Sequence, residues 1–160
     1  MRSRPRSLLL APLVAPLVAA LVTAAVATGS PAQTSGDPAV AAVLRDYIGL
    51  YTRDSLPAWR RLFSPTFTAT YTLAGDSTRT LGFEDFYQRQ ANAFASGQAI
   101  SEVLVDPRIE RDGRLAVVRS DFIYHNGETD RRGKLMLLLI QDRGRFVIQS
   151  LTFTYHLDPQ

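Results

Sequence analysis

Four strand-like runs after residue 100, joined by tight-turn signals, constrain the fold of this 160-residue chain more than any other feature. The runs are rich in β-branched, aromatic and aliphatic residues and read ISEVLVDPRIE, RLAVVRSDFIYH, GKLMLLLIQ and RFVIQSLTFTYHL. They are separated by Asp112-Gly113, Asn126-Gly127 and Asp142 to Gly144. Separators this short join neighbouring strands antiparallel, so the C-terminal half predicts an antiparallel meander.

Segments whose apolar residues recur with the period of a helix precede the meander. Asp37 is the expected N-cap of an amphipathic helix over 37–52, and Pro38 suits its first position. Asp54 is the expected cap of a second, short helix in DSLPAWRRLF, and FEDFYQRQANAF predicts a third. Between them, TFTATYTLAGDSTRTLG predicts a strand and a short return strand around a Gly-Asp turn. Helices segregated from an antiparallel sheet define the α+β class.

The N-terminus has the layout of a secretory signal peptide. Three arginines precede an uncharged apolar run that ends in small residues, and we assign residues 1–32 to it. Cleavage after Ala27 or Ala32 fits this pattern, and we prefer the second. Residues 33–36 then begin the mature chain as a flexible end, and 37–158 form a single domain. We therefore predict export to the periplasm or the exterior, without stable membrane association after cleavage.

An uncleaved N-terminal membrane anchor is the alternative to export. Leu8 to Ala27 is just long enough to cross ~30 Å of hydrocarbon. Pro12 and Pro16 weaken this stretch as a rigid span, so we favour the signal peptide.

Charge and cysteine content exclude several classes of function. The chain has 18 Lys and Arg against 15 Asp and Glu; removal of residues 1–32 takes away three arginines and leaves 15 against 15. Nucleic-acid binding needs a basic face, so we expect no nucleic-acid partner. Because the chain has no cysteine, it has no disulfide, no thiolate nucleophile and no thiolate metal site.

The order of these elements resembles the nuclear transport factor 2-like superfamily, and most closely its SnoaL-like and lumazine-binding-like groups. The resemblance covers roughly 37–157 and is carried by AWRRLFSPTFTATYT, LGFEDFY and GRFVIQSLTFTYH. It implies a cystatin-like roll, in which a curved antiparallel sheet forms a cone that the N-terminal helices close. Members include isomerases, dehydratases, hydrolases and proteins that only bind or dimerise, so the resemblance alone selects no function.

Alternation along the strand 115–125 places Arg119 and Asp121 on one face. With Asp121 opposite Leu137 and then Gln149 in the neighbouring strands, that face has an aliphatic lining with a few polar groups, as a small-molecule pocket requires. Two residues apart, Arg119 and Asp121 are within range of an ion pair, either around a ligand or on the solvated outer face. The predicted ligand-binding residues are Tyr47, Tyr51, Trp59, Arg119, Asp121, Gln149 and Tyr155.

Asp121 is the candidate catalytic base, with Tyr47 or Tyr51 as the proton donor. In the isomerases of the superfamily that the chain resembles, the base lies on the first strand after the second helix; here that position is Thr70 or Tyr71, and neither is a carboxylate. Asp121 and His125 are ~13 Å apart along their strand, which is too far for a direct hydrogen bond.

The histidines and acidic residues show no metal-ligand spacing. His125 and His156 are expected to be partly exposed residues at strand ends. No H-x-x-x-H or 2-His-1-carboxylate pattern is present, so we predict neither a metal nor another cofactor.

Three hypotheses for function follow. The first is an exported binding or accessory domain that holds a small, mostly apolar ligand in the cone. The second is an isomerase or dehydratase that uses a cone carboxylate and a tyrosine. The third is a structural homodimer with a filled cone. An open cavity with an isolated carboxylate of raised pKa favours the enzyme.

The run KLMLLLI is apolar on both alternating faces, so both faces of the sheet near it need a cover. Helices can cover only one. We therefore predict a homodimer through the outer sheet face, with an apolar patch formed by Val118, Phe122, Met136, Leu138, Phe146 and Ile148.

Overall fold

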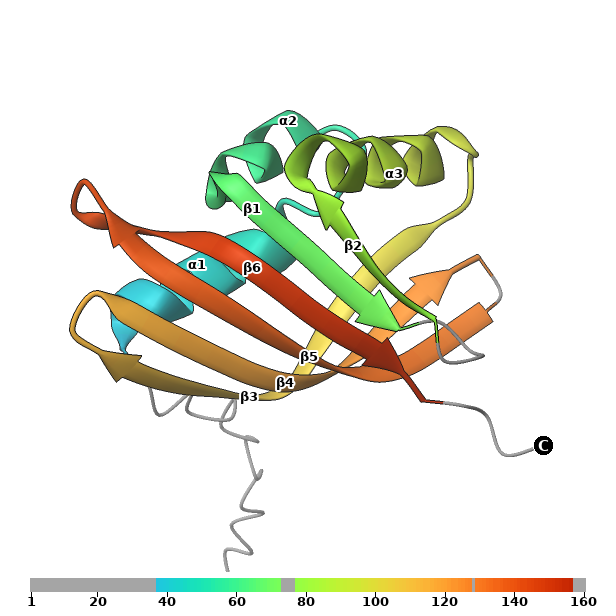
Figure 1. The fold of residues 1–160 in the computed structure, drawn as a ribbon. Helices are drawn as coiled ribbons and strands as arrows, with labels where there is room; N and C mark the ends of the chain where they lie inside the picture. The colour runs from blue at the N-terminus through green and yellow to red at the C-terminus, as the bar shows by residue number, and fades with distance from the viewer. Residues whose placement is uncertain (1–36, 73–76, 128, 157–160) are drawn as a thin grey trace, which may run out of the picture. The chain divides into compact units, whose positions relative to one another are not determined.

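Helices cover one face of a six-stranded sheet (Figure 1). The structure is a computed structural model that describes residues 37–72, 77–127 and 129–156. The expected order of helices, hairpin strands, helix and meander is confirmed. The helices are α1 (Pro38–Gly49), α2 (Leu56–Trp59), the 3₁₀ helix η1 (Arg60–Leu62) and α3 (Phe83–Ala95).

The sheet is curved and mixed, with strand order β2-β1-β6-β5-β4-β3 (Figure 1). The predicted meander is confirmed, because β3 to β6 pair antiparallel in sequence order. The first strand, however, pairs parallel with the last, so the sheet is not purely antiparallel. The strands are β1 (Phe63–Thr72), β2 (Thr78–Gly82), β3 (Ile100–Asp112), β4 (Leu115–Asn126), β5 (Thr129–Asp142) and β6 (Arg145–Tyr155).

Local signals account for most helix and turn positions. The Asp37 carboxylate accepts hydrogen bonds from the backbone N–H groups of Ala39 and Val40, at 2.9 and 3.2 Å, which confirms the predicted cap. The prediction that Asp54 caps the second helix is wrong, because that helix begins at Leu56 and Asp54 lies one residue outside the cap position. Gly113 and Gly127 have φ of 55° and 62°, the left-handed backbone that the hairpin turns require.

The pairing of β4 with β5 differs from the expected register. Asn126 faces Thr129 across a two-residue loop, which places Val118 opposite Leu137 and Asp121 opposite Lys134. The sequence prediction had Asp121 opposite Leu137, a shift of three residues. Because side chains alternate between the two faces of a strand, a shift by an odd number exchanges the faces. Every residue of β4 therefore lies on the face opposite to the predicted one.

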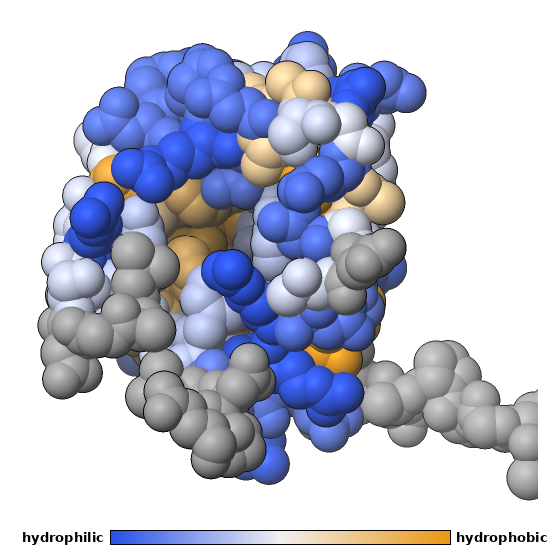
Figure 2. Space-filling view, turned by 90° about the vertical axis from the view of Figure 1, so that its right-hand side faces the viewer, coloured by the Kyte–Doolittle hydropathy of each residue, from blue (hydrophilic) through white to orange (hydrophobic). Residues whose placement is uncertain are grey.

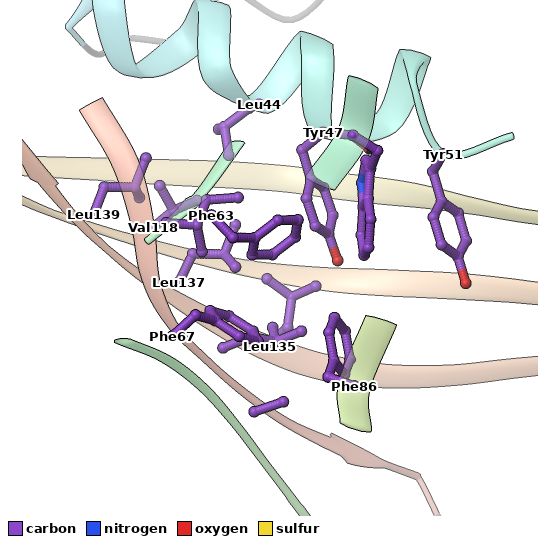
Figure 3. Close-up of a cluster of buried hydrophobic side chains, with 14 of the residues drawn as sticks. Leu44, Tyr47, Tyr51, Phe63, Phe67, Phe86, Val118, Leu135, Leu137 and Leu139 are labelled. Atoms are coloured by element: carbon purple, nitrogen blue, oxygen red, sulfur yellow. Dashed lines mark hydrogen bonds between the residues drawn. The ribbon is translucent and has the colours of Figure 1, made fainter. Parts of the chain in front are cut away.

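The core lies between the helices and the concave face of the sheet (Figure 3). Aromatic side chains from α1, α2, α3 and β1 pack over aliphatic residues of β4 and β5. Trp59 is the largest fully buried side chain, with 1% of its surface exposed. The aliphatic floor under these rings includes Val118, Leu135, Leu137 and Leu139.

The observed faces of β4 and β6 correct the predicted dimer patch. Val118, Phe122, Phe146 and Ile148 are all buried in the core and are not available on the outer face. Met136 remains outward and is 41% exposed. Other exposed large apolar side chains lie on β3 and β4, at Val103, Val105 and Leu115. The homodimer stays a prediction, with these residues in place of the buried ones.

Gly133 is required by the packing of Phe122. An added Cβ at Gly133 would lie 2.6 Å from Cε1 of the Phe122 ring and would also collide with the Thr154 carbonyl oxygen. We expect Gly133→Ala to lower the free energy of unfolding by about 1–3 kcal/mol in urea denaturation. Gly49→Ala is the matched control, because a Cβ there meets nothing within 4 Å, and it should not lower the stability. Equal stabilities of the two variants would contradict this packing.

Several sequence predictions lie outside the described residues. They are the signal peptide over 1–32, the mature end over 33–36, the turn at Gly75-Asp76 and the domain end at 158. Within the described ranges, no helix has the length and hydropathy needed to span a bilayer.

Candidate functional site

A cavity of about 280 Å³ lies between the helices and the concave sheet face. Figure 2 shows this side of the molecule hollowed, with an apolar interior and a hydrophilic rim. Half of the lining is aromatic, and the polar groups include one carboxylate and two guanidinium groups. The aromatic lining consists of Tyr47, Tyr51, Trp59, Tyr71, Phe86, Phe122, Tyr124, Phe153 and Tyr155.

Glu102 supplies the carboxylate of the cavity. It lies on the inner face of β3, opposite Tyr124 of β4. The residue as a whole is only partly buried, but its Oε1 atom is shielded from solvent and has no hydrogen-bond partner. Burial raises the pKa of Glu102 to about 7, and interaction with the Tyr47 hydroxyl opposes this rise only in part. An enclosed carboxyl group of this kind exchanges protons near neutral pH.

Four tyrosines line the same cavity as this carboxyl group. Burial is the main cause that raises the pKa of each phenol, and the nearby charge of Glu102 raises it further. The pKa of Tyr155 reaches about 12. These phenols therefore stay protonated at neutral pH and are hydrogen-bond donors. They are Tyr47, Tyr51, Tyr124 and Tyr155.

Two hydrogen bonds hold the helical side of the cavity in place. The Trp59 indole Nε1–H donates to the backbone oxygen of Tyr47 at 2.9 Å, which fixes the end of α1 against α2. The Tyr51 hydroxyl donates to Oε1 of Gln90 on α3 at 2.5 Å. In Figure 3 the Tyr47 and Tyr51 rings extend from α1 and the segment after it toward the sheet. A partner on α3 thus positions the Tyr51 ring, and Trp59 of α2 holds the backbone of Tyr47.

Of the seven residues predicted to bind a ligand, four lie in the cavity lining and three do not. Tyr47, Tyr51, Trp59 and Tyr155 are lining residues, as expected from their helix and strand positions. That they contact a ligand stays a prediction.

The prediction that Arg119 and Asp121 face the cone is wrong. Asp121 is paired with Lys134 at 2.6 Å and its side chain is 54% exposed, while Arg119 is paired with Glu110 at 2.5 Å. The hydrogen bond from Lys134 lowers the pKa of Asp121 below its usual value, as expected for a surface ion pair. Asp121 therefore lacks both the location and the protonation behaviour of a cavity base.

Gln149 does not face the cavity either. It is the extra residue of a β-bulge in β6, because Leu138 pairs with Ser150 while Leu139 pairs with Ile148. Its side-chain Nε2 donates to the backbone oxygen of Thr66 at 3.1 Å, and so links β6 to β1. The bulge breaks the alternation on which the sequence prediction relied.

Neither histidine lines the cavity. His125 Nδ1 lies 2.5 Å from the Asp130 carboxylate at the hairpin between β4 and β5, and His156 is exposed just after β6. The described residues also contain no group of three or more His, Cys, Asp or Glu side chains arranged to hold a metal ion.

Two larger surface depressions, of about 710 and 660 Å³, are more open than the cavity. In the described part of the chain, neither is lined by a buried polar side-chain atom that lacks a partner. The smaller cavity holds both such atoms, Glu102 Oε1 and Asn126 Oδ1. We therefore place the candidate site there.

Comparison with known proteins identifies the fold. No family model matches the chain, and no curated protein matches it in sequence. Among solved structures, an NTF2-like protein of unknown function from Silicibacter pomeroyi superposes with a TM-score of 0.58 at 17% identity, over 74% of this chain and 93% of that one. A provisionally assigned scytalone dehydratase from Novosphingobium aromaticivorans gives 0.61 at 13% identity, over 74% and 83%.

A third structure, a provisionally assigned dehydratase of the NTF2-like family from Streptomyces avermitilis, gives a TM-score of 0.60 at 12% identity, over 74% of this chain and 95% of that one. The chain therefore has the nuclear transport factor 2-like fold, in agreement with the resemblance in the sequence. Identities this low establish the fold alone, so function has to be argued from the cavity.

Proposed function

We propose that the chain is a proton-transfer enzyme of the isomerase or dehydratase kind, with Glu102 as its general acid and base. One observation carries this proposal: Glu102 lines the cavity, and its Oε1 atom is buried without a hydrogen-bond partner. A carboxylate in a structural role would have its acceptors filled by N–H or O–H donors, because an unpaired buried polar group is costly.

The arrangement supports removal of a proton from a carbon next to a carbonyl group. The Glu102 carboxylate accepts that proton, and the electron pair of the C–H bond moves toward the carbonyl oxygen. The Tyr47 hydroxyl donates a hydrogen bond to this oxygen as negative charge develops on it, whereas the Tyr51 hydroxyl already donates to Gln90. Protonated Glu102 then returns the proton to another carbon in an isomerisation, or to a departing hydroxyl group, which leaves as water, in a dehydration.

A pKa of about 7 suits one group to both steps. Near neutral pH such a carboxyl group is populated in both forms, so it is able to accept a proton and to return it. Burial in an apolar site is a general way in which enzymes bring a carboxyl pKa into this range. We also propose, from the N-terminal pattern alone, that the enzyme acts outside the cytoplasm.

Hydrogen–deuterium exchange tests the reaction without knowledge of the natural substrate. The mature chain is incubated in D₂O with a panel of cyclic enones, β-hydroxy ketones and hydroxyaryl ketones, and loss of C–H signals or release of water is followed by ¹H NMR. The proposal expects accelerated exchange for members that bind in the cavity. Binding that shifts cavity resonances without any exchange across the panel would instead support a binding or accessory domain.

A further inference from the structure

Opposite charges lie on one row of side chains across the inner face of the sheet. Glu102 of β3 pairs with Tyr124 of β4, and Tyr124 pairs with Arg131 of β5. Neighbouring strands are ~4.8 Å apart, so the Cα atoms of Glu102 and Arg131 are separated by roughly 10 Å. Tyr124 stands between them, and the two charges form no salt bridge with each other.

The rim of the cavity is positively charged. Arg131 and Arg89, which comes from α3, are both exposed and both line the cavity. The Arg131 guanidinium lies 5.7 Å from the centre of the Tyr155 ring, which directs it along the cavity wall. Within the described ranges, neither arginine has an ion-pair partner. Two such guanidinium groups favour an anionic group of a ligand at the rim.

The interior of the cavity contains hydrogen-bond acceptors instead of positive charges. Asn126 lies diagonally across from Glu102 on the inner face, because Ile100 faces Asn126 while Glu102 faces Tyr124. Asn126 Oδ1, like Glu102 Oε1, is buried without a hydrogen-bond partner. Each unfilled acceptor calls for a ligand group that donates a hydrogen bond, such as a hydroxyl.

We propose that the ligand is a small flat molecule with a carboxylate that binds Arg131 and Arg89 at the rim and a hydroxyl group that donates a hydrogen bond to one of the two acceptors inside, Glu102 or Asn126. The volume of about 280 Å³ is at the small end of the range for ligand pockets, which suits about one or two rings. The aromatic walls suit a flat ring that stacks on them. This inference rests on the proposed function and names the substrate class of the same site.

A cationic ligand is the main competitor. Aromatic walls around a carboxylate are also suited to an ammonium group, through cation–π attraction. However, a cation would have to enter past Arg89 and Arg131, which repel it. The rim charges therefore favour the anion.

Four matched probes test whether the cavity prefers a ligand with a carboxylate and a hydroxyl group: 4-hydroxybenzoate, benzoate, 4-hydroxybenzyl alcohol and 4-hydroxybenzylamine. Dissociation constants are measured by calorimetry, and the site is located by shifts of cavity resonances. We expect 4-hydroxybenzoate to bind at least about tenfold more tightly than the alcohol, the worth of one charge-assisted hydrogen bond, and more tightly than benzoate.

Arg131→Gln should remove the preference for 4-hydroxybenzoate over the alcohol. Arg132→Gln is the matched control and should keep it, because Arg132 pairs with Ile123 on the opposite face of the sheet. Equal or tighter binding of the alcohol or the amine overturns the inference, as does a failure of all four probes to bind in the cavity. If the preference for 4-hydroxybenzoate is absent while proton exchange still depends on Glu102, only the proposed ligand class is wrong. If the preference is present while proton exchange does not depend on Glu102, the proposed reaction is wrong.

Discussion

Glu102→Gln is expected to lower the rate of proton exchange by about 10²–10⁴-fold, the usual contribution of a general acid or base. The substitution keeps the shape of the side chain and removes its ability to take up a proton. It leaves the aromatic walls of the cavity intact, so substrate affinity should change far less than the turnover rate. NMR-detected exchange in D₂O, with substrate concentration varied, separates the two quantities.

Asp121→Asn is the matched control for this prediction. Asp121 is a carboxylate on the next strand, but it lies on the outer face in a salt bridge with Lys134. We expect its removal to leave the exchange rate unchanged. Loss of exchange in the Asp121 variant together with a normal rate in the Glu102 variant would contradict the assignment of the base.

Stability as a function of pH shows whether the Glu102 variant is folded. The pKa of Glu102 is raised from its ordinary value of 4.5 to about 7 in the folded chain. Its contribution to stability is therefore fully present below about pH 4.5 and is lost as the pH rises through about 7. Glutamine does not titrate, so above pH 7 the variant should be more stable than the wild type by about 3 kcal/mol. A loss of activity with a gain in stability cannot be ascribed to unfolding.

Trp59→Ala is expected to lower the free energy of unfolding by about 3–5 kcal/mol, as for other large aromatic residues in cores. Only 1% of the Trp59 surface is exposed, and its ring lies 4.5 to 6.0 Å, centre to centre, from those of Phe63, Tyr51, Tyr47 and Phe86. The variant also loses the indole hydrogen bond to the Tyr47 backbone. Because Trp59 is the only tryptophan, unfolding in urea is followed by circular dichroism.

Trp59→Phe is the control for the polar part of this effect. It keeps a large ring in the core and loses the N–H donor, so we expect a smaller loss than for alanine. A loss below about 1 kcal/mol in the alanine variant would show that Trp59 does not hold the helical side of the cavity.

The secondary structure could be predicted because its signals are local. Alternating runs bounded by Gly113 and Gly127 define the hairpins of the meander, and Asp37 defines the start of α1. Tyr47 of α1 could be placed in the cavity because the apolar stripe of a helix must face the sheet, and Tyr51 continues the same stripe just after the helix. The parallel pairing of β1 with β6 is a long-range contact, and no local signal in either strand encodes it.

The polar part of the site could not be predicted in the same way. The faces of β4 depend on whether the loop after Asn126 shifts the register by an odd or an even number of residues, and the sequence prediction was wrong by three. Glu102 was missed because β3 is apolar on both alternating faces, at Ile100 and Leu104 as well as at Val103 and Val105. The available signal was a single carboxylate between two apolar residues, Ile100 and Leu104, on the same face of a strand.

The proposed chemistry requires a carboxyl group in the cavity that titrates near neutral pH. It is tested most directly by ¹³C NMR of the mature chain with labelled glutamate side chains, in which the Glu102 resonance is assigned by its loss in Glu102→Gln and followed across the acid and neutral range. We expect this resonance to titrate with a pKa of about 7. A titration near 4.5, as in an exposed glutamate, would contradict it.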